Sequence, residues 1–362
     1  MSICLIGKNL TNLVLANVFA NKKLKVDIAY NLNTKKNETS RTLSISHDNY
    51  IYLKKINKNL NISAWPSEKI KIYNEKEKFK ELFEFKNNKK SIFYLLKYND
   101  IYNFFLNFSK KNKFINFAKA NSELKNINHK KNKYNLIINS TSNNFFTKKY
   151  FYKKIKKNYN SVAYTLIITH KKTKNNVAIQ VFTKIGPLAF LPVSNNQTSV
   201  VFSYNGRKKI TNEEVKKIIK TYNLEYQIIK FGKIEKFDLK FSMLREYGQK
   251  NILPFGDFLH RVHPLAGQGF NMTIRDIKIL SKLIDEKINL GMEIDNSLID
   301  NFQNETKHLN YIYASSIDFI YQFFNLDNKI NNILSEPFFK IIKNKKILNK
   351  FATHFADKGL AI

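Results

Sequence analysis

The residues with the clearest chemical potential lie in the run 254–271. Within it, Asp257 follows an apolar stretch and a glycine. Its carboxylate can accept two hydrogen bonds from sugar-type hydroxyls, while the backbone of Gly256 stays close to the ligand. Gly267 and Gly269 come just before an expected helix, whose first amides carry a partial positive charge and favour an anionic group. These residue types predict a site for a hydroxylated ligand with a negatively charged edge.

Two histidines in the same run raise the alternative of a metal site. His260 and His263 follow Asp257 at three-residue intervals. Pro264 comes next, and a proline disfavours helical structure in the residue before it, so the three side chains are not expected on one helix face. Since no other ligating residues cluster nearby in the sequence, we expect no metal.

The chain is strongly basic, with a formal net charge of +34 over 362 residues. Clustered basic residues would indicate binding to nucleic acid. However, only five of the 62 basic residues are arginine, and lysine is spread along the chain together with Asn, Ile, Phe and Tyr, the residues with AT-rich codons. We interpret the charge as a drift in genome composition and expect no nucleic-acid partner. Attraction of the lysines to an anionic membrane surface stays open.

The same drift makes the remaining glycines and prolines informative, because positions that keep them are those that need them. Glycine and proline gather in two places: Pro254, Gly256, Pro264, Gly267 and Gly269 in the first, and Gly186, Pro187 and Pro192 in the second. Both places are therefore candidates for tight backbone geometry.

Several features of the sequence predict a cytoplasmic protein. No stretch reaches the roughly 18 apolar residues that a membrane-spanning helix needs. The first residues lack the basic start of a signal peptide, and Gly7 interrupts the apolar run almost at once. A single cysteine, Cys4, excludes an internal disulfide and is expected to be buried. Peripheral contact with the inner membrane stays open.

Three kinds of pattern follow one another along the chain. Residues 4–6, 10–20 and 26–29 have the spacing of a strand, a helix and a strand, the unit that commonly opens a dinucleotide-binding domain. Short β-rich runs separated by polar turns follow, at residues 162–169, 177–182, 188–191 and 200–203. They predict an antiparallel meander. After Asn271 the apolar spacing is helical, and it stays mainly helical to residue 355.

Three segments resemble one known family. The run 256–271 resembles the second FAD motif of the ubiquinone-biosynthesis flavin hydroxylases, which are aromatic-ring monooxygenases shaped like para-hydroxybenzoate hydroxylase. The family pattern is Gly-Asp-Ala-Ala-His-x-x-His-Pro-Leu-Ala-Gly-Gln-Gly-Leu-Asn, and only Phe258, Leu259 and Phe270 depart from it. Residues 186–192 resemble the Gly-Pro-Leu-Ala-x-Leu-Pro run of the substrate-side sheet. Residues 41–46 resemble the early Arg-Thr-x-x-Leu-Ser segment near the flavin.

The resemblance implies an α/β fold, with a Rossmann-like FAD-binding domain, an antiparallel-sheet substrate domain and a helical C-terminal region. We expect a discontinuous FAD-binding domain formed by residues 1–60, 92–150 and 235–300. The substrate domain would comprise residues 61–91 and 151–234, and the helical region residues 301–362.

The resemblance also implies which residues contact FAD. Asp257 would bind the ribityl chain, Arg41 would lie near the flavin, and the 267–269 loop would bind the pyrimidine edge of the isoalloxazine. The full implied set is Gly7, Asn9, Asn12, Arg41, Gly256, Asp257, Pro264, Gly267, Gln268, Gly269 and Asn271. The implied reaction is hydroxylation of a polyprenylated phenol in ubiquinone biosynthesis, with NAD(P)H as reductant and no side chain required as acid or base.

Other family motifs are weakened, and all of them serve the ADP half of FAD or the middle segment. Of the Gly-x-Gly-x-x-Gly motif, expected at residues 7, 9 and 12, only Gly7 remains. Asn9 and Asn12 would keep the turn by adopting positive φ, but the side chain of Asn9 would intrude where the backbone should approach the pyrophosphate. Tyr30 replaces an acidic residue, residues 140–142 replace Ala-Asp-Gly, and an arginine expected near residue 99 is missing. We expect weakened FAD binding, with Lys8 contacting phosphate as a point charge.

An alternative from another class is a degenerate, non-catalytic scaffold in a lipid- or quinone-biosynthesis assembly. Bound flavin and NAD(P)H oxidation would separate the two functions. Phe182 and Phe190 could line a channel for a greasy substrate tail or belong to the core. An aromatic stretch in the region 311–324 is expected to pack between helices rather than meet a membrane or a partner.

Overall fold

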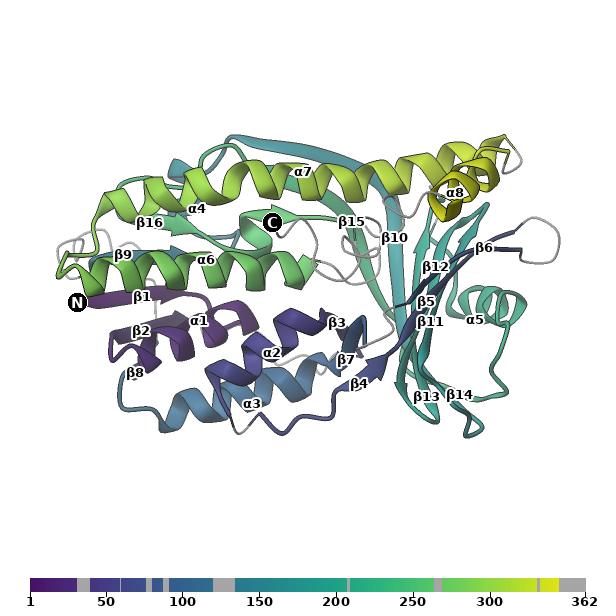
Figure 1. Ribbon diagram of the computed structural model, residues 1–362, viewed down its shortest axis with the longest axis horizontal. Helices are drawn as coiled ribbons and strands as arrows, with labels where there is room; N and C mark the ends of the chain where they lie inside the picture. The colour runs from purple at the N-terminus through teal and green to yellow at the C-terminus, as the bar shows by residue number, and fades with distance from the viewer. Residues whose placement is uncertain are drawn as a thin grey trace.

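The chain folds into two sheet-based parts joined by long strands and covered by a long helix (Figure 1). The computed structural model describes residues 1–30, 40–58, 60–75, 80–86, 91–119, 134–206, 209–263, 269–330 and 333–344. Parallel and antiparallel sheets with C-terminal helices confirm the expected α/β fold class.

The first part is built on a five-stranded parallel sheet in the order β16-β9-β1-β2-β8. Its strands are β1 (Ser2–Ile6), β2 (Lys25–Tyr30), β8 (Ile115–Lys119), β9 (Leu136–Asn139) and β16 (Ile252–Pro254). Helix α1 (Leu10–Asn21) connects β1 to β2 and packs against α3 (Tyr98–Lys111). Strand β9 is buried along its whole length, as strands covered on both faces must be. The expected strand-helix-strand opening is therefore confirmed.

A small antiparallel sheet lies beside this part and leads into two helices. It contains β3 (Thr42–Ser46), β4 (Trp65–Ser67) and β7 (Phe93–Lys97), in the order β3-β7-β4. Strand β3 runs directly into α2 (His47–Ile56), and β7 runs directly into α3. This sheet places residue 41 at the boundary with the second part.

The second part is a nine-stranded sheet in the order β17-β15-β10-β13-β12-β11-β5-β6, with β14 also paired to β10. Its strands are β5 (Lys69–Asn74), β6 (Glu81–Lys86), β10 (Lys154–His170), β11 (Val177–Thr183), β12 (Gly186–Ser194), β13 (Gln197–Tyr204), β14 (Ile228–Phe231), β15 (Glu235–Leu244) and β17 (His260–Arg261). All pairs are antiparallel except β11 with β5. Helix α5 (Asn212–Thr221) covers one face with Val215 and Ile219. Strands β11, β12 and β13 form an antiparallel meander as expected, whereas β10 pairs with β13 and not with β11.

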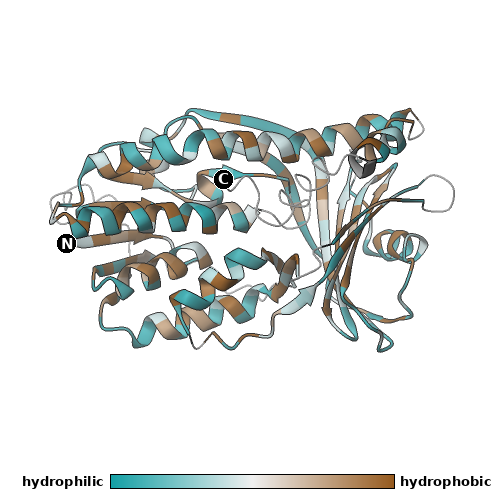
Figure 2. Cartoon of the chain, viewed as in Figure 1, coloured by the Kyte–Doolittle hydropathy of each residue, from teal (hydrophilic) through white to brown (hydrophobic). Residues whose placement is uncertain are grey.

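Three further helices complete the described chain: α6 (Gly269–Asn289), α7 (Asn296–Lys329) and α8 (Ser335–Asn344). The short helix α4 (Phe145–Tyr150) lies near β9 and β16 in Figure 1, and η2 (Gly256–Phe258) directly follows β16 in the chain. Figure 2 shows hydrophilic and hydrophobic residues interspersed along α6 and α7, as amphipathic helices require. Within the residues described, no helix is long and apolar enough to cross a membrane.

Helix α7 connects the two parts by packing on both. Near its start, Phe302 stacks on Phe255 at 5.7 Å between ring centroids, beside the parallel sheet. Near its end, Phe324 stacks on Phe182 of β11 with the rings parallel to within 5°. Phe182 therefore belongs to a core between helix and sheet, and Phe190 is likewise buried in the sheet core. Of the aromatic residues expected to pack, Tyr313 and Tyr321 are buried, whereas Phe319 is exposed.

Candidate functional site

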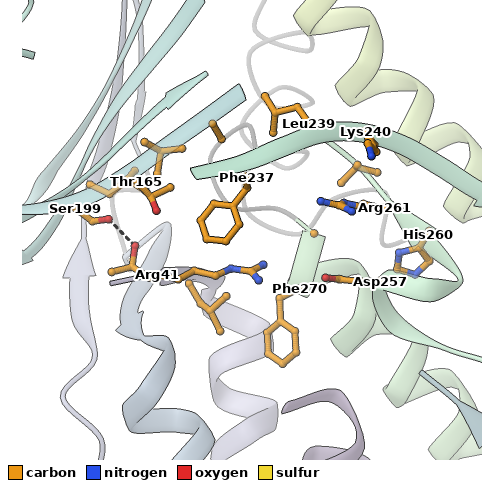
Figure 3. A pocket seen from close by; sticks show the side chains of 17 residues that line it. Arg41, Thr165, Ser199, Phe237, Leu239, Lys240, Asp257, His260, Arg261 and Phe270 are labelled. Carbon is orange, nitrogen blue, oxygen red and sulfur yellow. Dashed lines mark hydrogen bonds between the residues drawn. The ribbon is translucent and has the colours of Figure 1, made fainter. Parts of the chain in front are cut away.

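A cavity of about 160 Å³ lies where the two parts of the molecule meet (Figure 3). Its lining comes from the start of β3, from the antiparallel sheet and from the segment around η2, β17 and the first turn of α6. The lining residues with polar or charged side chains are Arg41, Thr42, Thr165, Ser199, Lys240, Asp257, His260 and Arg261. Residues that are far apart in the sequence thus face one space.

Asp257 reaches the cavity because β16 ends in a tight turn. Gly256 has φ +63°, and a Cβ at this position would lie 3.0 Å from Oγ1 of Thr11 on α1. Glycine therefore allows η2 to pack directly on α1. The Asp257 side chain is exposed toward the cavity, and it makes no hydrogen bond within the part of the chain that is described. An unpartnered carboxylate at this place is available to a ligand.

Arg41 approaches the same space from the opposite side. Figure 3 shows its guanidinium directed toward the region between Phe237 and Asp257. The guanidinium carbon also lies 5.7 Å from the ring centroid of Tyr98. Burial raises the pKa of Tyr98 above its usual value, Arg41 opposes this effect, and the negative charge of Asp257 adds to it. The charges of Arg41 and Asp257 thus both reach Tyr98, from two separate segments of the chain.

Positive side chains outnumber negative ones around the cavity. Lys240 and Arg261 join Arg41, whereas Asp257 is the one carboxylate among the described lining residues. Arg261 donates a hydrogen bond to the backbone carbonyl of Asp238 at 3.2 Å, which holds its guanidinium near the rim. The excess of positive charge favours a ligand with an anionic edge.

Helix α6 begins at the cavity and is anchored there by Asn271. Its first residue, Gly269, lines the cavity. The side chain of Asn271 accepts hydrogen bonds from the amide of Ser46 and from Asn49, both at 3.0 Å, and donates one to the carbonyl of Ser44 at 2.8 Å. These bonds fix the start of α6 against β3 and α2. The predicted contacts at Pro264, Gly267 and Gln268 lie outside the described residues.

His260 is paired with a buried carboxylate. Its Nε2 lies 2.6 Å from Oδ2 of Asp276 on α6, and neither side chain is exposed. Asn310 of α7 donates a further hydrogen bond to the same oxygen at 3.3 Å. His260 therefore links β17 to α6, and no cluster of three potential metal ligands occurs among the residues with described positions.

His263 is buried against two aromatic side chains. Its ring stacks on Tyr321 at 4.3 Å and meets Tyr159 edge-on at 5.3 Å. Burial lowers the pKa of His263 from 6.5 to about 3, although the charge of Asp318 acts in the opposite direction. The imidazole is neutral in the folded protein at neutral pH.

This burial predicts acid sensitivity that depends on His263. Between pH 7 and pH 5 the unfolded chain takes up a proton at this residue and the folded chain does not, so folding stability falls with pH. The loss is about 2 kcal/mol over this interval. Replacing His263 with Phe should reduce the loss by that amount in denaturant unfolding measured at both pH values. The matched control, His308→Phe on the exposed face of α7, should leave this loss of stability unchanged. An unchanged pH dependence in His263→Phe would contradict the assignment.

Comparison with known proteins identifies the relatives of this chain. Residues 139–309 match the FAD binding domain family. The ubiquinone biosynthesis monooxygenase COQ6 of Danio rerio is 25% identical over 207 residues, which are 45% of this chain and 43% of that protein. The ubiquinone hydroxylase UbiL of Rhodospirillum rubrum is 24% identical over 142 residues, 37% of this chain and 33% of that protein. The chain is a divergent relative of the ubiquinone-biosynthesis flavin hydroxylases. Its matches span less than half the length of these two relatives.

Solved structures show that this relative of the flavin hydroxylases has the fold of FAD-dependent monooxygenases. The p-nitrophenol 4-monooxygenase PnpA of Pseudomonas putida superposes with a TM-score of 0.77, covering 99% of this chain and 98% of that one, at 8% identity. PqsL of Pseudomonas aeruginosa, a probable FAD-dependent monooxygenase, superposes with a TM-score of 0.70, covering 94% of this chain and 99% of that one, at 11% identity. The fold is therefore retained at very low sequence identity.

The β1–α1 turn differs from the expectation that Asn9 and Asn12 adopt positive φ. Gly7 has φ +110°, but Asn9 is extended at φ −128° and Asn12 lies within α1, so neither asparagine adopts positive φ. Hydrogen bonds hold the turn instead. Asn12 donates to the carbonyls of Ile6 and Gly7, at 3.0 and 2.7 Å. The prediction of positive φ was wrong because asparagine can hold a turn with its side chain as well as with its backbone.

Sequence reasoning missed several cavity residues of this flavin-hydroxylase relative. Phe237, Lys240 and Arg261 line the cavity, and Asp276 supports it through His260. Asp276 had a detectable signal, because it is a charged residue on the apolar face of α6 between Ile274 and Ile277. The other three lie on exposed strand positions with no distinguishing pattern.

Proposed function

We propose that the chain is an FAD-dependent monooxygenase that hydroxylates an aromatic ring. The observation that carries this proposal is the convergence of Asp257, Arg41 and the start of α6 on one cavity between the two sheets. A flavin presents ribityl hydroxyls and an electron-rich ring edge, and these are the groups that such residues recognise.

The residues at the cavity fit the ribityl and ring end of FAD. Asp257 directs an unpartnered carboxylate into the space and would bind the ribityl hydroxyls. Gly269, at the positive end of α6, would lie at the ring edge, and Arg41, just before β3, would orient the ring. FAD, reduced by NAD(P)H, would supply the transfer of one oxygen atom from dioxygen to the substrate.

The remaining walls favour an aromatic substrate. Phe237, Phe270, Leu239, Leu191 and Val201 form the apolar part of the lining. They would exclude water and pack against a ring. A volume of about 160 Å³ is below the usual range for drug-sized ligands, so a prenyl tail would extend outward from the cavity.

For the finer assignment we propose a polyprenylated phenol of ubiquinone biosynthesis as substrate, because the named relatives act in that process. Deletion of the gene should then cause a quinone precursor lacking one hydroxyl to accumulate, as detected by mass spectrometry. The purified protein with flavin and NAD(P)H should incorporate an atom of labelled dioxygen into that precursor. An unchanged quinone profile in the deletion strain would refute this substrate.

Other parts of this assignment stand as proposals of the same kind. We propose an FAD-binding domain at 1–60, 92–150 and 235–300, a substrate domain at 61–91 and 151–234, and a helical region at 301–362. We also propose that the protein belongs to a quinone-biosynthesis complex. Its proposed location is cytoplasmic, with peripheral membrane contact. The exposed Tyr311, Ile312 and Phe319 on α7 give such a contact an apolar surface.

A second candidate function is a non-catalytic scaffold that keeps the flavoprotein fold. The observation in its favour is the β1–α1 turn, where the side chain of Asn9 already accepts the amide of Asn12. A scaffold would neither perturb flavin absorption nor oxidise NAD(P)H in the presence of flavin and phenol. Either activity would exclude this candidate.

A further inference from the structure

The N-terminus of α1, where the dinucleotide fold usually holds a diphosphate, is capped from within. Oδ1 of Asn9 accepts the amide of Asn12 at 3.1 Å. Nδ2 of Asn9 donates to Oγ of Ser140 at 2.7 Å, and that hydroxyl donates in turn to the carbonyl of Ile6 at 3.1 Å. The Asn9 side chain therefore lies over the turn that a diphosphate would have to approach.

The residues after β9 close the turn from the other side. Thr141 packs over Gly7 so closely that a Cβ on this glycine would lie 2.4 Å from the threonine methyl. Thr141 is held there by Asn139, which accepts its amide at 3.1 Å, and by Asn144, which donates to its hydroxyl at 2.7 Å. Opening the turn would therefore break several hydrogen bonds.

The side chain of Tyr98 also approaches the first turn of α1. The backbone of Leu10 lowers the pKa of this tyrosine, against the larger effect of burial. Because the amide of Asn12 is already bound to Asn9, a phosphate would have to displace that cap.

The lysine expected to contact phosphate points elsewhere. Nζ of Lys8 lies 4.9 Å from the ring centroid of Tyr30 and 5.8 Å from that of Phe117. The two rings meet edge-on at 6.4 Å, at the end of β2 and on β8. This group occupies the strand end where the ribose of a dinucleotide usually binds.

We infer that this chain recognises a flavin by its isoalloxazine ring and ribityl chain alone, so that riboflavin binds about as tightly as FAD. The inference rests on the proposed function, since it uses the same cavity. Asp257, Arg41 and the start of α6 line the cavity where that end of the ligand would lie, whereas the α1 turn at the diphosphate end is capped by Asn9 and packed by Thr141.

The test compares riboflavin with FAD by quenching of flavin fluorescence on the full chain. We expect the two dissociation constants to agree within about tenfold. The titrations are repeated at several salt concentrations, because a chain of net charge +34 attracts the diphosphate non-specifically and salt screens that attraction. A preference for FAD of more than about a hundredfold that persists at high salt would overturn the inference.

Two substitutions at Asn9 locate the diphosphate. Aspartate caps a helix as well as asparagine does, so Asn9→Asp keeps the cap on Asn12 and adds a negative charge at the turn. The bond that Asn9 donates to Ser140 is lost, and the Ser140 hydroxyl can rotate to donate to the new carboxylate instead. The substitution should leave FAD and riboflavin affinities unchanged. A loss of FAD affinity by more than about tenfold, with riboflavin unaffected, would place the diphosphate on α1 and overturn the inference.

Asn9→Gly removes the side chain from the turn and should tighten FAD selectively, by about tenfold. The matched control is Thr211→Gly, which removes the cap of α5 on the far side of the antiparallel sheet and should affect neither flavin. Unchanged FAD affinity in Asn9→Gly would contradict the role given to this side chain. If no variant binds either flavin, the proposed function fails and the inference fails with it. A strong preference for FAD defeats the inference alone.

Discussion

Asp257→Asn is expected to weaken flavin binding by about tenfold to a hundredfold. A hydrogen bond to a charged group contributes about 1.5 to 3 kcal/mol, and 1.4 kcal/mol corresponds to a factor of ten. The asparagine has the same shape but lacks the charge, and one of its two terminal groups cannot accept a hydrogen bond from a ribityl hydroxyl. Fluorescence titration of wild type and variant with riboflavin measures the change.

The control for this substitution is Asp300→Asn, an exposed carboxylate near the start of α7 and away from the cavity. It removes the same charge from the protein and should leave flavin affinity within about twofold of wild type. Because Asp257 is exposed and makes no hydrogen bond to the described chain, its replacement should not change the unfolding midpoint. Wild-type affinity in Asp257→Asn would mean that the carboxylate does not contact the flavin.

Gly186→Ala is expected to destabilise the protein by about 3 kcal/mol or more. This glycine begins β12 at φ +127°, a conformation that other residues rarely adopt. An added Cβ would lie 1.9 Å from the backbone oxygen of Ser203 in the neighbouring strand region. A backbone oxygen cannot rotate away as a side chain can, so the sheet itself would have to move. Denaturant unfolding followed by circular dichroism measures the loss.

Gly291→Ala separates backbone strain from this clash. Gly291 also has positive φ, at +68°, but an added Cβ would meet nothing within 4 Å. Its replacement should cost about 1 kcal/mol, from strain alone. Equal losses in the two variants would show that the contact with Ser203 does not matter.

Much of the fold could be predicted because local patterns determine it. The apolar spacing of residues 10–20 and the glycine-rich start of α6 are visible without any tertiary information. The start of β10 at Lys154 could not be predicted from local patterns, because residues 154–161 are mostly polar. They form a strand through pairing with β15, which follows much later in the chain. Tertiary contacts override the weak local preference there.

The candidate site could be predicted at the residues that stand in motifs. Asp257 and Arg41 lie in runs whose residue types indicate a ligand, and both face the cavity. Lys240 and Arg261 could not be found, because they belong to a lysine-rich background and reach the cavity only through the pairing of β15 with β17. The intrusion of the Asn9 side chain at the β1–α1 turn could be predicted, but its bond to Ser140 could not, since the two residues meet only in the folded chain.

The central claim is that a flavin binds in the cavity between Asp257, Arg41 and the start of α6. The visible absorption spectrum of the purified chain, titrated with riboflavin and with FAD, tests this claim most directly. We predict a saturable perturbation of the flavin band with one flavin per chain, accompanied by a rise in Tm. A spectrum that remains that of free flavin, with an unchanged Tm, would contradict it.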